Sequence, residues 1–493
     1  MKTILLTGLL LAGTQLAQAN EADCKQLAKA GLFEHMTVTE ANFYPADAAK
    51  SLPANCDVKG VVAAVPGSKV TVVYRLPENW NGKMLAFGGG GWAGNTTLAT
   101  ATPGLTKGYA TAQTNAGHDS KSGFDTTWVE GNPVAMTDFS YRAVHQMTVT
   151  GKSVVERYYG KAAARNYFHG CSTGGRMGLM EAQRFPDDYD GIVAGAPVYS
   201  LLVQTSGAVR NRIFTAPGAA ISAAQMQRVN QAALAACDAS DGLKDGVVTD
   251  PRRCGWSPGS LQCKAGESGE SCLTTAQVGA LRKAYTTVKD ASGVVGNYAL
   301  TRGGEGGWTR FVQATPTGES DASNGGLGEL LPYMFGDAKY DIAKFDPLKD
   351  QAAVHKTPFA KEYEASNPQL TAFLKRGGKL LMWHGFDDPG PSPYATIDYF
   401  DKAQAVNGKD AAIRLFIAPG VYHCRGGPGA DQFDLIDEID RWVEKQQAPQ
   451  AIAAKNSQTG VERPLCAYPT LPYYKGSGDV NEAGSFACKA PAP

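Results

Sequence analysis

A serine held between two glycines constrains the fold of this chain more than any other feature. The pentapeptide Gly-Cys-Ser-Thr-Gly at residues 170–174 follows an apolar run at 166–169 that predicts a strand, and a predicted helix at 175–185 comes after it. A G-x-S-x-G sequence between a strand and a helix is typical of the nucleophile elbow, a tight turn that exposes a serine hydroxyl at the end of a strand. We therefore expect Ser172 to be the nucleophile of an enzyme with an α/β fold.

Strands and helices alternate on both sides of this turn. Strands are predicted at residues 60–65, 69–76, 83–87, 166–169, 191–194, 379–382 and 413–418. Helices, with apolar side chains at near-helical spacing, are predicted at residues 139–159, 175–185 and 432–446. Such alternation indicates a parallel sheet covered by helices.

The alternation stops between about residues 203 and 369, in a stretch rich in Gly, Ala, Asp and Thr that holds four cysteines. We predict an inserted cap at residues 203–369 and a catalytic domain made of residues 20–202 and 370–493. The polar, Pro-rich tail from residue 448 onward carries two further cysteines that would fasten it to the body of the protein.

Residues 1–19 have the pattern of a secretory signal peptide. Lys2 supplies an early positive charge, residues 4–12 are apolar, and Ala17-Gln18-Ala19 is a small-residue cleavage site. We expect cleavage after Ala19 and a secreted or periplasmic protein. No later segment approaches the twenty or so apolar residues of a membrane helix, so we expect no membrane contact. The chain has 47 basic and 47 acidic side chains, and this balance argues against a nucleic-acid partner.

All ten cysteines lie beyond the predicted cleavage site, and their number is even. In an exported chain this pattern predicts a disulfide framework. Zinc is the alternative, but the chain has no C-x-x-C pair that would support it. The cysteines are Cys24, Cys56, Cys171, Cys237, Cys254, Cys263, Cys272, Cys424, Cys466 and Cys488.

An activated serine needs a base, and the base needs an acid that orients it. On this kind of fold the chain order is Ser, then Asp or Glu, then His, with each residue just after a strand. Asp387 and Asp388 follow the predicted strand at 379–382, and His423 follows the one at 413–418. Spacing does not separate the two aspartates. His169 and His384 are the alternative bases. His169, however, lies inside a predicted strand, and His384 precedes the acid, which breaks this chain order.

Cys171 directly precedes the predicted nucleophile, and Cys424 directly follows the predicted base. If Ser172 and His423 form a hydrogen bond, the two cysteines come within disulfide reach, since bridged Cα atoms lie roughly 4.4–6.8 Å apart. Such a bridge would hold the base against the nucleophile.

A glycine run follows the predicted strand at 83–87. It matches G-x-G-x-x-G, but no acidic residue ends a second strand about twenty residues later, so we expect no dinucleotide and no other organic cofactor. The run is better explained as an oxyanion loop, in which the N–H of Gly90 or Gly91 acts with the N–H of Thr173. Gly91 is our candidate.

An acidic loop lies inside the predicted cap, at residues 237–247, with three carboxylates within eight residues. Its spacing is not that of an EF-hand. Hard oxygen ligands between Cys237 and Cys254 would nevertheless suit Ca²⁺. The alternative is a pair of Asp-Gly turns with solvated carboxylates.

The arrangement Cys-Ser, Asp, His-Cys resembles that of the tannase and feruloyl esterase family, which also includes the mono(2-hydroxyethyl) terephthalate hydrolase. The resemblance covers most of the mature chain. It rests on specific motifs at residues 88–94 (GGGGWAG), 138–145 (DFSYRAVH), 170–175 (GCSTGG), 384–388 (HGFDD), 423–427 (HCRGG) and 463–466 (RPLC).

The resemblance implies an α/β-hydrolase fold with a large inserted cap that is stapled by disulfides and calcium. The family pattern of His-Gly, two residues and Asp selects Asp388. The Pro-Gly-Pro-Ser-Pro sequence at 389–393 departs from the apolar Ile-Pro of relatives. The resemblance implies the disulfides Cys171–Cys424, Cys237–Cys254, Cys263–Cys272, Cys466–Cys488 and Cys24–Cys56, and a structural Ca²⁺ on the side chains of Asp238, Asp241 and Asp245 and the carbonyls of Leu243 and Val247.

The function implied is a secreted serine esterase acting on esters of aromatic acids, with Ser172, His423 and Asp388 as the catalytic residues. A feruloyl esterase is our first expectation, and a tannase or a terephthalate monoester hydrolase is the alternative on the same scaffold. A noncatalytic, calcium-stapled binding protein is the alternative from another class, although an intact triad argues against it. The cap should bind the aromatic ring, and Trp308 and Arg310 are our candidates for that contact.

Overall fold

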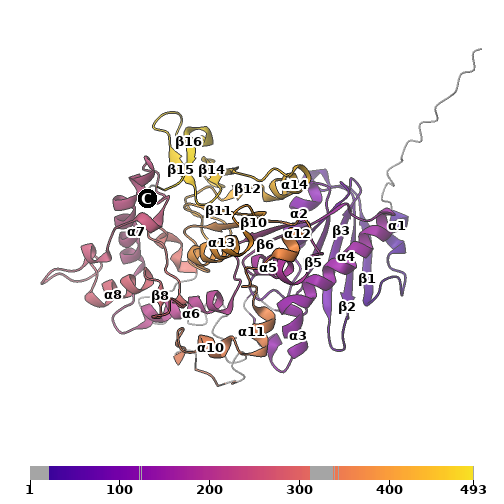
Figure 1. The fold of residues 1–493 in the computed structure, drawn as a ribbon, viewed down its shortest axis with the longest axis horizontal. Coiled ribbons are helices and arrows are strands. Elements are labelled where there is room, and N and C mark those ends of the chain that lie inside the picture. Colours follow the sequence, from indigo (N-terminus) through magenta and orange to yellow (C-terminus); the bar gives the residue numbers. More distant parts are fainter. Residues whose placement is uncertain are drawn as a thin grey trace, which may run out of the picture.

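The computed structural model describes residues 21–120, 123, 125–310, 337, 339–341 and 344–491. Its centre is a nine-stranded sheet in the order β1-β2-β3-β5-β4-β6-β7-β10-β11 (Figure 1). The strands are β1 (Met36–Tyr44), β2 (Asn55–Val62), β3 (Val70–Pro77), β4 (Lys83–Phe87), β5 (Ala110–Thr114), β6 (Arg165–Cys171), β7 (Gly191–Gly195), β10 (Lys379–Gly385) and β11 (Ile413–Ala418). Strands β1, β2, β3 and β5 pair antiparallel, whereas those from β5 to β11 in this order pair parallel. The predicted α/β-hydrolase fold is confirmed.

Helices cover both faces of this sheet (Figure 1). The helices of the described chain are α1 (Glu21–Gln26), α2 (Leu98–Thr106), α3 (Pro133–Thr137), α4 (Ala143–Tyr159), α5 (Thr173–Arg184), α6 (Leu201–Thr215), α7 (Ala223–Cys237), α8 (Thr275–Ala284), α10 (Gln351–Val354), α11 (Pro358–Tyr363), α12 (Thr371–Lys375), α13 (Pro393–Asn407) and α14 (Leu435–Lys445). Within the described ranges, none of them combines the length and the apolar character needed to cross a membrane.

Alternation along the strands sends side chains to two separate cores, because successive residues of a strand point to opposite faces. Met84 and Ala86 of β4 belong to the large core that includes α4 and α5. Leu85 and Phe87 of the same strand belong to a second core with α2 and α14. The amphipathic helix α14 supplies that core with a stripe of buried residues, namely Leu435, Ile436, Ile439, Trp442 and Val443.

Several predicted boundaries differ from those of the structure. The strand predicted at 60–65 ends at Val62, just before a turn through Pro66 and Gly67. The helix predicted at 139–159 begins with a π-helical turn at Asp138–Arg142 before α4. The sequence pattern does not predict strands β1 and β5 of this sheet. Strand β5 (sequence ATAQT) is too short and too poor in large apolar residues to give a strand pattern.

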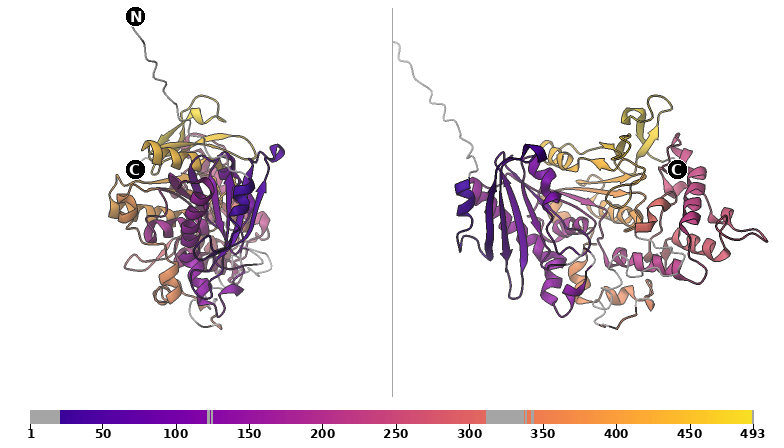
Figure 2. Two further views of the ribbon diagram at one scale, coloured as in Figure 1. Left: turned by 90° about the vertical axis from the view of Figure 1, so that its right-hand side faces the viewer. Right: turned by 180° about the vertical axis from the view of Figure 1, so that it is seen from behind.

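The segment after β7 builds a hydrophobic cluster of its own, which includes Phe214, Val229, Leu281 and Trp308. Figures 1 and 2 show α6, α7 and α8 at the end of the molecule opposite the antiparallel strands β1 and β2. This segment also contains the two-stranded β8 (Val288–Lys289) and β9 (Val295–Asn297). Residues from Phe345 to 365, by contrast, contribute to the large core of the sheet. A division into a catalytic domain and a cap is our proposal, with the second boundary nearer residue 345 than the predicted 369.

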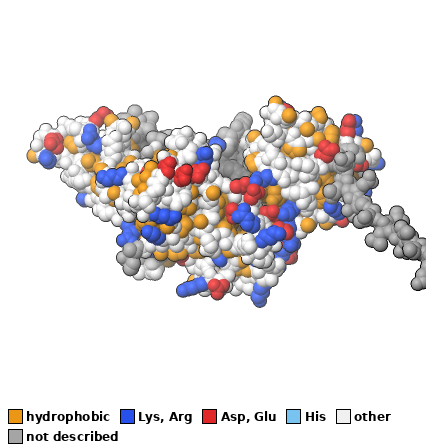
Figure 3. Space-filling view, turned by 90° about the horizontal axis from the view of Figure 1, so that it is seen from above, with side chains coloured by type: hydrophobic (Ala, Val, Ile, Leu, Met, Phe, Trp, Pro, Cys, Tyr) orange, Lys and Arg blue, Asp and Glu red, His pale blue; other side chains and the backbone are white. Residues whose placement is uncertain are grey.

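Small sheets and disulfides fasten the C-terminal tail and the loops. The remaining strands are β12 (Gln432–Phe433), β13 (Ala451–Lys455), β14 (Glu462–Cys466), β15 (Leu471–Tyr474) and β16 (Phe486–Lys489). The disulfides are Cys24–Cys56, Cys171–Cys424, Cys237–Cys254, Cys263–Cys272 and Cys466–Cys488, the pairs that the family resemblance implies. Viewed from above, acidic and basic side chains are interspersed over the surface, in keeping with the balanced net charge (Figure 3).

Candidate active site

Ser172 stands on a strained turn between β6 and α5. Its backbone has φ 63° and ψ −123°, and residues other than glycine rarely adopt a positive φ. Its N–H donates to Gly195 O at 2.9 Å, and its carbonyl accepts from Arg176 N at 3.0 Å. A Cβ built on Gly170 would lie 2.5 Å from the Gly174 carbonyl carbon, so the first glycine of the motif has no room for a side chain. These features are those of a nucleophile elbow.

His423 and Asp388 form the second half of the site, at the carboxyl ends of β11 and β10. His423 Nδ1 lies 2.6 Å from Asp388 Oδ2, and both side chains are buried. Because an ionised carboxylate only accepts hydrogen bonds, Nδ1 carries the proton and donates it to Asp388. Ser172 and His423 both line one cavity of about 530 Å³. The three predicted catalytic residues are thus assembled at one edge of the sheet.

Asp388 is held in its ionised form by several donors. Its Oδ1 accepts from Gly390 N at 2.7 Å, and its Oδ2 lies 3.1 Å from His384 Nε2. Burial alone would raise the pKa of Asp388, but the charge of His423 and the hydrogen bonds from His384 and His423 outweigh burial and lower that pKa well below its ordinary value. The carboxylate is therefore available to orient His423.

His384 is a second partner of Asp388, a contact that the sequence does not predict. Its Nε2 lies 3.0 Å from Pro391 O as well as close to Asp388, so this nitrogen is the donor. Its Nδ1 then accepts from the Thr396 hydroxyl at 2.7 Å. The spacing of four residues between His384 and Asp388 at a strand end is the signal that would have suggested this contact.

Asp387 points away from His423, toward the segment between β9 and η7 (Glu305–Arg310). Its Oδ1 is 3.5 Å from the Thr301 hydroxyl, and its Oδ2 has no hydrogen-bond partner among the described residues. Burial, followed by the charge of Glu305, raises the pKa of Asp387 well above its ordinary value. The structure therefore places Asp388, and not its neighbour, against the predicted base.

Arg210 of α6 connects the cap segment to the loop that carries Asp388. Its guanidinium is buried and donates through Nη2 to Gly390 O, while Nε donates to Ser206 O at 3.1 Å. Burial lowers the pKa of Arg210 to about 10. The sequence held no signal for this contact, because Arg210 and Gly390 are 180 residues apart.

The disulfide Cys171–Cys424 joins the residue before the predicted nucleophile to the residue after the predicted base. The two Cα atoms are 6.1 Å apart, and the bond spans 253 residues of sequence. Cys424, like Ser172, has a positive φ, of 62°. The bridge therefore ties the end of β6, next to the strained Ser172, to the strained Cys424 beside the predicted base.

Removing this bridge should lower the free energy of unfolding by roughly 5 kcal/mol, by the chain-entropy estimate for a loop of this length. We expect Cys171→Ala/Cys424→Ala to unfold at lower urea concentration than wild type and to lose kcat while still folded. The Cys263→Ala/Cys272→Ala variant is the matched control, because its loop spans only 9 residues and the same estimate gives about 2.5 kcal/mol. Equal losses in the two variants would contradict the prediction.

The predicted oxyanion loop lies beside the elbow. Gly91 has φ +57°, and a Cβ there would come 2.0 Å from Gly123 O, so this position requires glycine. The Thr173 hydroxyl donates to Gly91 O and ties the loop to the start of α5. The first N–H groups of a helix have no intrahelical partner, which leaves Thr173 N–H available to a ligand. A Cβ built on Gly90 would meet no atom within 4 Å, and Gly90 is the alternative donor.

His169, a competitor for the role of base, lines the same cavity but faces Phe87, with ring centroids 5.8 Å apart. Burial lowers the pKa of His169 to about 4, so its ring is neutral near pH 7. Since the unfolded chain binds this proton more readily, the ring stabilises the fold above pH 6.5, and that contribution is lost as the pH falls toward 4.

Stability to urea should therefore decrease between pH 6.5 and 4, with His169 contributing roughly 3 kcal/mol at most, since one pKa unit corresponds to about 1.4 kcal/mol. We expect His169→Gln to reduce this dependence, while the buried His118, whose pKa burial also lowers to about 4, continues to contribute to it. An unaltered slope in His169→Gln would contradict the assignment.

Trp308 lies in the core of the cap segment and is 1% exposed. Its ring packs against Phe214 and Tyr285, with centroids 6.0 Å and 5.6 Å away. It is not part of the wall of the cavity at Ser172. This burial argues against the predicted substrate contact and assigns the ring to packing. The side chain of Arg310 lies outside the described residues.

The carboxylates of the acidic loop are satisfied in the structure mainly by the loop itself. Asp238 accepts from the N–H groups of Asp245 and Gly246, and Asp241 accepts from Leu243 N and, at 2.7 Å, from the Thr249 hydroxyl. Among the ion pairs of the described chain, none involves either of these buried aspartates.

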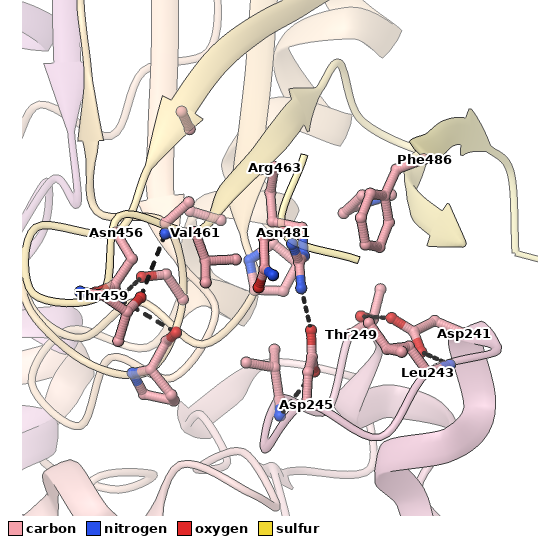
Figure 4. Close-up of a pocket in the computed structure, with 18 of the residues that line it drawn as sticks. Asp241, Leu243, Asp245, Thr249, Asn456, Thr459, Val461, Arg463, Asn481 and Phe486 are labelled. Carbon is pink, nitrogen blue, oxygen red and sulfur yellow. Dashed lines mark hydrogen bonds and ion pairs between the residues drawn. The ribbon is translucent and has the colours of Figure 1, made fainter. Parts of the chain in front are cut away.

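Asp245 differs from the other two aspartates because its Oδ2 accepts from Arg463 Nη2 of β14 at 2.6 Å (Figure 4). The donor set of carboxylates and carbonyls suits a hard divalent cation in kind. The three carboxylates do not, however, converge on one point in this conformation.

One other group of side chains could hold a metal. In the described part of the chain, His145, Glu181 and Asp188 are the only His, Cys, Asp or Glu side chains that place three possible ligand atoms within 4.8 Å of one another. His145 Nδ1 lies 2.7 Å from Asp188 Oδ2. Burial and the neighbouring Asp188 raise the pKa of Glu181 well above its ordinary value. A raised pKa disfavours the ionised carboxylate that a metal ligand requires, so this cluster is not proposed as a metal site.

The chain is similar to known proteins over most of its length. A family model described as tannase and feruloyl esterase matches residues 56–489. Mono(2-hydroxyethyl) terephthalate hydrolase of Piscinibacter sakaiensis is 34% identical, over 90% of this chain and 86% of that protein. A probable feruloyl esterase of Arthroderma benhamiae is 35% identical, over 85% and 82%. The crystal structure of feruloyl esterase B from Aspergillus oryzae superposes on this chain with a TM-score of 0.82 at 26% identity. The superposition covers 95% of this chain and 100% of that one.

Proposed function

The chain belongs to the tannase and feruloyl esterase family and is a carboxylic ester hydrolase, and from this premise we propose that it hydrolyses esters of aromatic hydroxy acids through an acyl-enzyme on Ser172. The observation that carries the mechanism is the 2.6 Å contact between His423 and Asp388, in a cavity that Ser172 shares with His423. The predicted alternative of a noncatalytic binding protein is wrong for a member of this family of hydrolases.

In the first half-reaction, Ser172 Oγ attacks the ester carbonyl carbon while His423 Nε2 takes the hydroxyl proton. Asp388 keeps the proton on Nδ1 and stabilises the imidazolium that forms. The carbonyl oxygen becomes an oxyanion, which accepts hydrogen bonds from the N–H groups of Thr173 and Gly91 in the proposed mechanism. When the tetrahedral intermediate collapses, His423 returns its proton to the leaving alkoxide, and the acyl group stays on Ser172.

In the second half-reaction, a water molecule loses its proton to His423 Nε2 and attacks the acyl carbon. Collapse of the second tetrahedral intermediate breaks the bond to Ser172 Oγ, which regains the proton from His423. The products are the free aromatic acid, the alcohol and the unchanged enzyme.

A feruloyl ester is our first choice of substrate. The names of two relatives, the probable feruloyl esterase of Arthroderma benhamiae and feruloyl esterase B of Aspergillus oryzae, support it. A terephthalate monoester is the second candidate, supported by the name of the Piscinibacter sakaiensis relative. A galloyl ester, as cleaved by tannases, is the third, supported by the description of the family model.

The test is a parallel measurement of kcat/KM on methyl ferulate, methyl gallate and mono(2-hydroxyethyl) terephthalate with the purified enzyme. We expect methyl ferulate to be the best of the three. A higher value on either of the others would move the assignment to that substrate, and no hydrolysis of any of them would overturn the aromatic-ester proposal.

We also propose that the acidic loop holds a structural Ca²⁺ through Asp238, Asp241, Asp245, Leu243 and Val247. The burial of Asp238 and Asp241 without a cationic side chain in contact supports this, because buried charges are ordinarily paired or bound to a metal. The ion would supply positive charge that holds the loop together, and it takes no part in the ester chemistry.

Calcium should therefore raise the thermal stability of the protein. At a free concentration about 100 times its Kd, an ion that binds only the folded state adds about 2.7 kcal/mol. We expect EDTA to lower the Tm, excess Ca²⁺ to restore it, and Asp241→Asn to remove the calcium response. The same Tm with EDTA and with Ca²⁺ would contradict the site.

Export is proposed as well. It is supported by the five disulfides, since disulfides form and persist in oxidising compartments such as the periplasm and the extracellular space.

A further inference from the structure

A second cavity lies on the antiparallel part of the sheet, and no residue of the triad lines it. Its volume is about 620 Å³, within the range of sites that hold small molecules. The described wall is formed by the end of β1, the loop that follows it, strands β2 and β3, and the start of α2. The proposed ester chemistry gives this cavity no role.

The register of the strands gathers the polar side chains of the second cavity on one face. Tyr44 of β1 pairs with Asn55 of β2, and Asp57 of β2 pairs with Arg75 of β3. Paired residues, and residues two apart along a strand, point to the same face of a sheet. The side chains of these four residues therefore lie side by side on that face.

Arg75 offers free hydrogen-bond donors in the wall of the second cavity. The residue is only 6% exposed, and its Nε donates to Asp57 Oδ1 at 3.0 Å, which fixes the guanidinium. Its two Nη nitrogens have no hydrogen-bond partner among the described residues, yet they are not shielded from solvent. A planar guanidinium that is already held in place loses little freedom when its remaining N–H groups bind the oxygens of a ligand.

The charges in the wall of the second cavity are balanced. Arg75 pairs with Asp57, and Lys50 Nζ lies 2.8 Å from Asp47 Oδ2. Two basic side chains thus face two acidic ones, and the described wall carries no net charge that would attract an anion or a cation. This balance favours a neutral ligand whose hydroxyl groups accept hydrogen bonds from Arg75.

Two exposed apolar side chains complete the wall. Tyr44 is 49% exposed and Leu98 is 43% exposed. A sugar ring has C–H groups on its faces and hydroxyl groups around its edge. It can therefore pack on the tyrosine ring while its hydroxyls bind the guanidinium of Arg75, a combination of apolar and polar contacts that matches this wall.

The second cavity and the cavity at Ser172 are neighbours across the start of α2. Thr97 lines the cavity at Ser172, and the next residue, Leu98, lines the second one. In the sheet beneath, Arg75 pairs with Thr111 of β5, while Gln113, two residues further along the same face of β5, lines the cavity at Ser172. A chain-like ligand bound in the second cavity is thus held close to the triad.

We propose that the second cavity binds a neutral polysaccharide, with one sugar ring on Tyr44 and sugar hydroxyls on the Nη groups of Arg75. It is a binding site separate from the triad, and it anchors a polymer beside the cavity at Ser172. The binding itself does not depend on the proposed ester hydrolysis, so the two proposals can fail independently.

The test measures binding in the absence of hydrolysis. Enzyme with Ser172 blocked by a serine-directed phosphonate is titrated with arabinoxylan freed of ferulate, a neutral polysaccharide, and Kd is measured by affinity gel electrophoresis. We expect Tyr44→Ala and Arg75→Lys each to weaken binding roughly three- to tenfold, the scale of one aromatic contact or one hydrogen bond. Tyr44→Phe keeps the ring and should bind like wild type. Val406→Ala is the matched control, because Val406 is 51% exposed on α13 and lines neither cavity.

Thermal melting of each variant separates loss of fold from loss of binding. No binding of arabinoxylan by wild type, or equal Kd values in wild type and in the folded Tyr44→Ala and Arg75→Lys variants, would overturn the site. Binding that the phosphonate abolishes would assign the polysaccharide to the cavity at Ser172 and would also overturn it. Tighter binding of the anionic polygalacturonate than of arabinoxylan would contradict a neutral ligand. If the phosphonate formed no adduct, the nucleophile assignment would fail, while titration of the unblocked variants would still test the second cavity.

Discussion

Ser172→Ala should lower kcat on the best ester by about 10⁵- to 10⁶-fold, the scale on which removal of a catalytic serine acts in other triad hydrolases. Alanine removes the attacking oxygen, so no acyl-enzyme forms, and the activity that remains comes from oxyanion stabilisation and substrate binding alone. The strained backbone of Ser172 is set by the turn between β6 and α5 and not by the hydroxyl, so we expect the variant to fold normally.

The measurement is kcat for ester hydrolysis, together with mass spectrometry after treatment with a serine-directed phosphonate. We expect a covalent adduct on Ser172 in wild type and none in the alanine variant. Ser153→Ala is the control, because Ser153 is an exposed serine on α4. Turnover by Ser172→Ala at the rate of wild type would refute the nucleophile assignment.

Asp388→Asn should lower kcat by about 10⁴-fold, since an asparagine can donate to the imidazole and favours the tautomer in which Nε2 is no longer a free base. The adjacent Asp387 provides a matched control within the same loop. Burial and Glu305 raise the pKa of Asp387, so a neutral amide is a close substitute for its carboxyl group. We expect Asp387→Asn to keep kcat within a few-fold of wild type.

The measurements are kcat across pH and the urea midpoint of unfolding for both variants. A loss of kcat in Asp388→Asn at every pH, with an unchanged urea midpoint, supports an orienting role and not a structural one. The reverse ranking, with Asp387→Asn the more damaged enzyme, would assign the catalytic acid to Asp387 and contradict the geometry.

Local features of the sequence determined the centre of the site. A nucleophile elbow is made by residues adjacent in the chain, so the glycines around Ser172 and the flanking strand and helix predict it directly. The chain order of Ser172, the aspartates and His423 follows from which strands end at one edge of the sheet. Motifs that resemble those of a known family then supplied the disulfide pairs and the choice of Asp388.

Contacts between distant segments were decided only by the tertiary structure. Arg210 reaches Gly390 across 180 residues, and Gln113 lines a cavity with Ser172 only because β5, β4 and β6 are neighbours in the sheet. Trp308 is of a residue type that is common in binding sites, yet its side chain is buried in the cap segment. Whether an aromatic ring or a buried amide faces a ligand or a core depends on which elements pack against it, and a pattern of neighbours along the chain does not contain that information.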